Sequence, residues 1–149
     1  MALNDGQVNV INDIVNLVNI FIKSNKNIPK CVFDELSTTK DSLCLTTTSD
    51  SNAIEKMADV TGLFLTGTLR LKIMYRVMSL TTGNDDLKYI GILDSIYQYI
   101  QSCYKTTQFN NFYIEKVTQI SGAKLEAVYP GGVKDFSGIF EIQYERRVK

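Results

Sequence analysis

The stretch Phe136–Arg147, with the sequence FSGIFEIQYERR, decides what kind of structure ends the chain. Phe136, Phe140, Ile142 and Tyr144 fall on one face of an extended backbone, and mostly polar residues fall on the other. Because successive side chains of a β-strand point to opposite faces, this period of two predicts a half-buried strand. We therefore expect sheet at the end of the chain, after two segments with helical periodicity.

A second and longer strand pattern runs over Leu63–Leu80. Its odd-numbered positions are apolar almost throughout, whereas its even-numbered positions mix cations with large apolar side chains. A period of two held over this length predicts one long strand, or two strands joined by a bend near Gly67. The odd-numbered face should therefore belong to the core.

The even-numbered face of this strand is the candidate functional surface. A face turned to solvent would not usually carry Phe and Met among its cations, and Arg, Met and aromatic residues are enriched where proteins contact one another. We therefore predict a subunit interface here; the alternative is that helices cover both faces of the strand. The candidate interface residues are Phe64, Arg70, Lys72, Met74, Arg76 and Met78.

Two segments show the three- and four-residue spacing of apolar side chains that is typical of amphipathic helices. The first is Gln7–Ser24 and the second is Leu87–Tyr104. Before the second helix, Thr81–Asp86 provides a turn and an N-cap, with acidic residues that oppose the helix dipole favourably. Both helices are expected to pack on the sheet.

Shorter β-branched runs predict strands between the first helix and the long strand. Cys31–Leu36 and Leu43–Thr48 are separated by the polar segment Ser37–Ser42, which suggests a hairpin. Ser49–Gly62 has too few apolar residues to form a stripe. It predicts an exposed loop with at most one helical turn around Ala53–Ala58.

The segment after the second helix contains two further strand patterns, Phe112–Ile120 and Lys124–Tyr129. Ser121–Gly122 separates these two runs, and Pro130–Gly132 separates the second run from the final strand. The predicted fold class is therefore α+β, with a mixed or antiparallel sheet and two amphipathic helices packed on it. We expect a single domain spanning residues 1–149.

The charge balance limits the classes of partner. The 149 residues include 16 Lys and Arg and 16 Asp and Glu, so no net field gathers nucleic acid or an anionic membrane. Asn and Asp interrupt the apolar segment Val8–Ile22, and the N-terminus has no signal-peptide pattern, so we expect a cytoplasmic origin without a membrane span. The basic residues Arg146, Arg147 and Lys149 predict a solvated terminus, or alternatively a contact with a partner subunit.

The residue types that common catalytic and metal sites need are sparse. The chain has no His, and the distant residues Cys31, Cys44 and Cys103 predict buried free thiols rather than a disulfide framework or a zinc site. The acidic pairs Asp34–Glu35 and Asp85–Asp86 are explained by a strand-end turn and a helix cap. We therefore expect no enzymatic activity, no cofactor and no metal.

The order of elements and several strand patterns resemble a known family. An amphipathic helix and a short hairpin precede the strand step Ile73–Val77, a second helix begins at Asn84–Leu87, and the last strand has the form F-x-I-x-Y-E over Phe140–Glu145. In these respects the chain resembles the tail-terminator and minor capsid proteins of long-tailed bacteriophages. The resemblance covers most of the chain.

This resemblance implies a virion structural protein that acts in virus assembly and head–tail joining. Such a subunit belongs to a hexameric ring on the head-proximal end of the tail tube, where it stops polymerisation of the tube. The implied partners are copies of itself, the tail tube protein and a head-completion or connector protein, with DNA only as passing cargo and no membrane. The loops Ser37–Ser42, Ser49–Gly62 and Pro130–Ser137 would then make the axial contacts.

Other interpretations stay open from the sequence. The chain would equally suit another head–tail connector or a tail-completion protein. A different class is a cytoplasmic binding module that holds a small molecule between helix and sheet. The last alternative is an enzyme whose site has no recognised motif.

Overall fold

The computed structural model describes residues 3–24, 27–48, 55–58, 60–78, 83–103 and 112–148. In chain order, the elements of this part are α1 (Asp5–Lys23), β1 (Cys31–Phe33), β2 (Ser42–Thr47), β3 (Lys56–Met57), β4 (Phe64–Val77), α2 (Gly83–Ser102), β5 (Phe112–Val128), the short 3-10 helix η1 (Pro130–Gly132) and β6 (Lys134–Arg147). The start of the predicted turn, Thr81–Thr82, and the basic residue Lys149 lie outside the described residues, as does Tyr104 at the predicted end of the second helix.

The strands form one mixed sheet in the order β1-β2-β4-β6-β5, and β3 pairs with β4 beside this path. β1 and β2 are parallel, and all other strand pairs in the described part are antiparallel. β4 and β6 pair over their full length, from Phe64 opposite Arg147 to Val77 opposite Lys134. The predicted α+β class with a mixed or antiparallel sheet is therefore confirmed.

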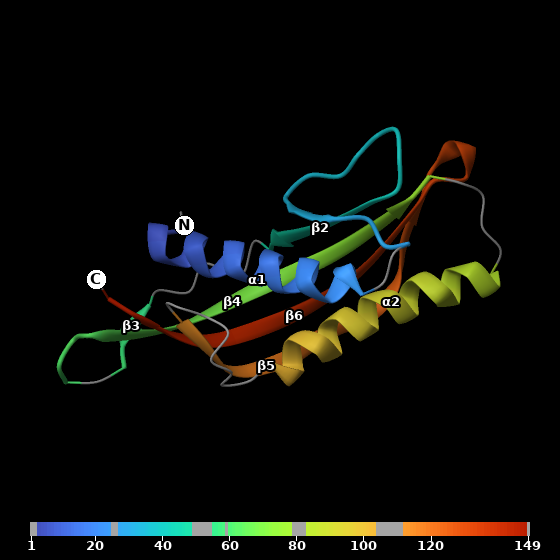
Figure 1. The fold of residues 1–149 in the computed structure, drawn as a ribbon. Coiled ribbons are helices and arrows are strands. Elements are labelled where there is room, and N and C mark those ends of the chain that lie inside the picture. Colours follow the sequence, from blue (N-terminus) through green and yellow to red (C-terminus); the bar gives the residue numbers. More distant parts are fainter. Residues whose placement is uncertain are drawn as a thin grey trace.

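Both helices cover the same face of the sheet and lie next to each other there (Figure 1). The rings of Phe21 on α1 and Tyr99 on α2 lie 5.2 Å apart between centroids, and both side chains pack against the core. The strands contribute their alternate apolar residues to that same core. The buried strand residues with the largest side chains are Leu43, Leu45, Leu69, Leu71, Ile73, Tyr75, Phe136, Phe140 and Tyr144.

The N-terminus of α1 is fixed by a capping box. Asn4 accepts a hydrogen bond from the backbone N–H of Gln7 at 2.8 Å, and the Gln7 side chain accepts one from the backbone N–H of Asn4 at 3.1 Å. Further along α1, Asn19 uses its side-chain amide to bond both the N–H and the C=O of Cys31, at 2.8 and 3.0 Å. This polar helix residue therefore occupies the open side of β1.

The two long strand predictions are confirmed. β4 runs as one strand through Gly67, and its odd-numbered residues from Leu69 to Val77 are buried. Phe136, Phe140 and Tyr144 of β6 are each at most 1% exposed and belong to the core beneath the helices.

The predicted hairpin between Cys31–Leu36 and Leu43–Thr48 is wrong, because the two strands run parallel with Cys31 opposite Leu43. After Phe33 the chain turns at Asp34, which has a positive φ of 56°. Its carboxylate then accepts a hydrogen bond from Thr46 at 2.7 Å. Because β1 is so short, the polar loop that follows it can carry the chain back to the level where β1 begins. β2 then starts beside the first residue of β1 and runs parallel to it.

The predicted loop Ser49–Gly62 is mostly exposed where it is described, as expected, but the helical turn near Ala53–Ala58 is wrong there. Lys56–Met57 forms β3, which pairs with Leu65 and Thr66 of β4. Residues 49–54 and 59 lie outside the described residues. Pairing with β4 satisfies backbone groups that a helical turn of this length would leave partly unpaired.

The two strands predicted within Phe112–Tyr129 are a single strand, β5. Ser121–Gly122 does not break it; the pairing with β6 shifts register on both sides of Ser121 instead. The turn at Pro130–Gly132 is confirmed, with φ of 84° at Gly131 and 83° at Gly132, a region open mainly to glycine. The predicted loop Pro130–Ser137 is shorter than expected, since β6 begins at Lys134.

Candidate subunit interface

Five of the six predicted interface residues lie along the sheet face that points away from both helices, which we call the outer face. Five belong to β4 and Met78 follows it directly. No helix of the described part covers this face, so the alternative that helices cover both faces of the strand is wrong there (Figure 1). All six are partly exposed: Phe64, Arg70, Lys72, Met74, Arg76 and Met78.

Each cation of this set is paired with an acid on another strand, which the sequence did not reveal. The pairs are Arg70–Glu141 at 3.0 Å, Arg76–Asp135 at 2.8 Å, and Lys72–Glu126. Glu141 and Asp135 lie directly opposite their partners in the β4–β6 register. The outer face therefore presents neutralised pairs beside apolar side chains rather than a strip of positive charge.

Arg76, Asp135 and Tyr129 form a compact cluster at one end of the outer face. The Asp135 carboxylate is 1% exposed and accepts two hydrogen bonds from Arg76, at 2.8 and 2.9 Å, and one from the Tyr129 hydroxyl at 3.1 Å. The Arg76 guanidinium also lies 5.6 Å from the centroid of the Tyr129 ring. The hydrogen bonds to Asp135 raise the pKa of Arg76, so this end keeps its charge and its geometry.

A second polar cluster lies on the helix side of the sheet, where Glu55 is 4% exposed. Its carboxylate accepts hydrogen bonds from Tyr144 at 2.8 Å, from Arg146 at 2.6 and 2.7 Å, and from Asn4 at 2.7 Å. The predicted solvated terminus is therefore wrong for Arg146. Through these hydrogen bonds, Glu55 connects the segment before β3 to the start of α1 and the end of β6. The sequence did not indicate this role, because Glu55 is a single acidic residue in a polar segment.

Burial raises the pKa of Glu55, but the hydrogen bonds from Arg146, Asn4 and Tyr144 outweigh it, so its net pKa is lowered. Burial and the bond to Glu55 raise the pKa of Tyr144. Both groups therefore hold the protonation states that favour the cluster at neutral pH.

The lowered pKa of Glu55 predicts a specific loss of stability in acid. A group with a depressed folded pKa contributes stability above its unfolded pKa, about 4.3 for Glu, and loses it as the pH falls through the folded value. We expect the difference in unfolding free energy between the wild type and Glu55→Gln to be constant near pH 7 and to shrink below about pH 4. Urea titrations across this range measure it, and a difference independent of pH would contradict the assignment.

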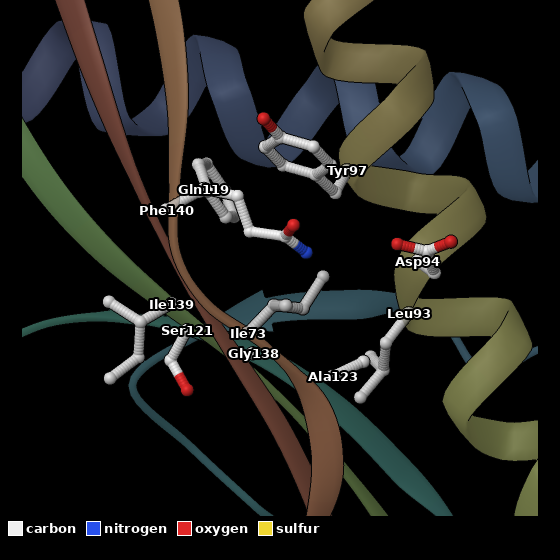
Figure 2. Close-up of a pocket in the computed structure, with 10 residues that line it drawn as sticks. All are labelled: Ile73, Leu93, Asp94, Tyr97, Gln119, Ser121, Ala123, Gly138, Ile139 and Phe140. Carbon is white, nitrogen blue, oxygen red and sulfur yellow. The ribbon is translucent and has the colours of Figure 1, made fainter.

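Two hollows of very different size lie on the helix side. Figure 2 shows the smaller, between Leu93, Asp94 and Tyr97 of α2 and the β5–β6 pair, with a volume of about 10 Å³. It has room for about one water molecule, whereas small-molecule sites usually have about 300–1,000 Å³. The larger is a groove of about 460 Å³ where α1 ends and α2 begins.

The three cysteines are buried and free, as predicted. Burial raises the pKa of Cys31 to about 12 and of Cys44 to about 11, and it also raises that of Cys103. Among the described residues, no three His, Cys, Asp or Glu side chains are placed to bind a metal ion. Neither described helix has the length and apolar character needed to cross a bilayer.

No protein-family model matches the chain, and no curated protein sequence is significantly similar to it.

Proposed function

We propose that this chain is a virion structural protein of a long-tailed bacteriophage, a tail terminator whose copies form a hexameric ring. The ring caps the tail tube at its head-proximal end, stops polymerisation and forms the joint to the head connector. The proposal rests on the resemblance in element order and strand patterns, together with the composition of the outer face.

The outer face is the observation that carries this proposal. Phe64 and Met74 lie there among paired charges, partly exposed and without a covering layer in the described part of the chain. A closed ring needs each subunit to present two different, complementary surfaces. The outer face has the mixed composition of one such surface.

The remaining partners follow from the same proposal. The tail tube protein and the head-completion protein would meet the loop Ser37–Ser42 and the turn Pro130–Gly132, because loops adapt to different partners above and below a ring. DNA passes through the ring as cargo only. The balanced charge of the chain suits a bore that does not hold DNA tightly.

The oligomeric state of the purified chain tests the proposed function. We expect native mass spectrometry to find a hexamer, or a monomer that converts to a hexamer on addition of purified tail tubes, and negative-stain electron microscopy to find rings at tube ends. A chain that stays monomeric both alone and with tubes would overturn the proposal. Binding to the head portal but not to tubes would favour another connector protein.

Substitution of Gln143 by Arg tests the outer face itself. Gln143 is exposed on β6, opposite Thr68 of β4, and it has no part in the ion pairs of this face. A longer, charged side chain in a packed subunit contact must be desolvated and disturbs the fit of the two surfaces, so the hexamer should be lost at concentrations where the wild type is fully assembled. Native mass spectrometry measures this.

The matched control is Gln101→Arg, the same change at an exposed position of α2. This variant should assemble like the wild type, and both variants should keep the far-UV circular dichroism of the wild type. Normal assembly of Gln143→Arg would exclude the outer face from the interface. This site is a cleaner test than reversing Arg70, Lys72 or Arg76, because each of those changes also breaks an ion pair within the subunit.

A further inference from the structure

The hairpin formed by β3 and the start of β4, described over residues 56–58 and 60–65, carries exposed apolar side chains. Met57 is 68% exposed, Val60 is fully exposed and Leu63 is 50% exposed. The hairpin extends beyond the body of the sheet, on the same side of the molecule as the C-terminus (Figure 1). Clustered exposed apolar residues of this kind mark protein contact sites more often than ordinary surface.

Backbone contacts hold this hairpin in place. Ala58 N–H donates to the Phe64 carbonyl at 3.0 Å, and Val148 N–H donates to the Leu63 carbonyl at 2.7 Å. Gly62 has a φ of 71°, which a turn between the two strands requires and glycine adopts without strain. The apolar side chains are therefore presented from a fixed support.

The larger groove lies at the opposite end of the molecule. It opens beside the C-terminal end of α1, the N-terminal half of α2 and the end of β4 (Figure 1). Its volume of about 460 Å³ can hold several side chains. Apolar and charged groups both line it, among them Ile28, Asp41, Tyr75, Lys88, Tyr89 and Ile92.

We propose that the hairpin of one copy inserts into the groove of the next copy. Met57 and Val60 would pack on the partly exposed side chains of Tyr89 and Ile92, while Lys56 at the base of the hairpin would face Asp41. The hairpin joins β4 at its first residues, whereas the groove residue Tyr75 lies near the last residue of β4, so the hairpin cannot reach the groove of its own subunit.

Because the two surfaces differ and lie at opposite ends, the contact is head-to-tail. Head-to-tail contacts generate rings when the rotation between neighbours closes. This inference rests on the proposed ring and deepens it. In addition to the outer face, it names the two surfaces through which neighbouring subunits would contact each other head-to-tail.

Val60→Lys tests the hairpin. An ammonium at the tip would be brought beside the ammonium of Lys88 in the groove of the next copy, so we expect the fraction of hexamer to fall at least tenfold in native mass spectrometry. Val8→Lys makes the same change on the solvent side of α1 and should leave assembly unchanged. Both variants should keep the wild-type melting temperature, because Val60 makes no buried contact within its own subunit.

Crosslinking tests which surfaces meet. The double variant Val60→Cys with Lys88→Cys is treated with a short bis-maleimide under conditions that assemble the wild type. We expect a denaturing-gel ladder that rises to the full copy number of the ring, whereas either single variant should give no species beyond a dimer. The native thiols are buried and poorly ionised, so they should not react.

The outcomes separate the two proposals. A hexamer that tolerates Val60→Lys and gives no ladder overturns the hairpin contact and leaves the ring standing. A wild-type chain that never assembles overturns the ring and the hairpin contact together. A monomer whose melting temperature rises with a small metabolite would instead make the groove a ligand site.

Discussion

Replacing Glu55 by Gln is expected to lower the free energy of unfolding by about 3–5 kcal/mol, the usual effect of removing one partner of a buried ion pair. The carboxylate is almost fully buried and accepts every hydrogen bond of its cluster. The neutral glutamine leaves the guanidinium of Arg146 buried without a counter-charge. In addition, both carboxylate oxygens of Glu55 accept hydrogen bonds, whereas only one end of the glutamine amide, its oxygen, can do so. Guanidinium or urea unfolding followed by circular dichroism measures the change.

The control is Glu126→Gln, which removes one acid from a half-exposed pair on the outer face. Solvent screens that pair with Lys72, so its loss should cost at most about 1 kcal/mol. Equal effects of the two substitutions would mean that Glu55 is solvated in solution. In that case α1, β6 and the segment before β3 would not be joined as described.

Gly67→Ala is expected to destabilise the fold by about 1–3 kcal/mol, the usual cost of forcing extra atoms into a packed core. A Cβ at this position would lie 2.5 Å from the Tyr144 hydroxyl and 2.6 Å from the ring carbon that bears it. Tyr144 is fully buried and its hydroxyl is held by Glu55, so the ring cannot move aside without breaking that bond. The midpoint of thermal or denaturant unfolding reports the loss.

Gly91→Ala is the matched change on α2, where an added Cβ meets no atom within 4 Å. It should raise the free energy of unfolding by about 0.5–1 kcal/mol, because alanine loses less backbone entropy than glycine in a helix. Opposite signs for the two substitutions are the expected result. A neutral Gly67→Ala would show that the Tyr144 ring is not fixed beside β4.

The sequence predicted those elements whose pattern repeats over many residues. One face of each long strand and each helix meets the core and is apolar. This produces a period of two in β4 and β6 and a helical spacing in α1 and α2, and both periods can be recognised in the sequence alone. The same alternation predicted that Phe64, Arg70, Lys72, Met74, Arg76 and Met78 share one face, and the first five lie along that face of β4.

The features that the sequence did not reveal depend on pairing between distant segments. The direction of β1 against β2 is set by a loop whose composition also suits a reversing turn. Ser121–Gly122 has the composition of a turn. However, β6 pairs with β5 on both sides of it, and the irregularity is taken up by shifts in the pairing register. The acids opposite Arg70 and Arg76 become partners only through the β4–β6 register, and Glu55 reaches Arg146 across 91 positions of sequence.

The hydrogen bonds from the Asn19 side chain of α1 to the backbone of β1 limit how copies of this chain can aggregate. Stacking of sheets edge to edge into a fibril requires two open edges on every copy. In the described part of this chain, one edge offers the long strand β5, but the opposite edge consists of the short strands β1 and β3, and Asn19 already bonds the backbone of Cys31. Among the described strands, a second copy finds a long open edge only at β5, and two copies joined there present no further long edge, so edge-to-edge growth should stop at a pair.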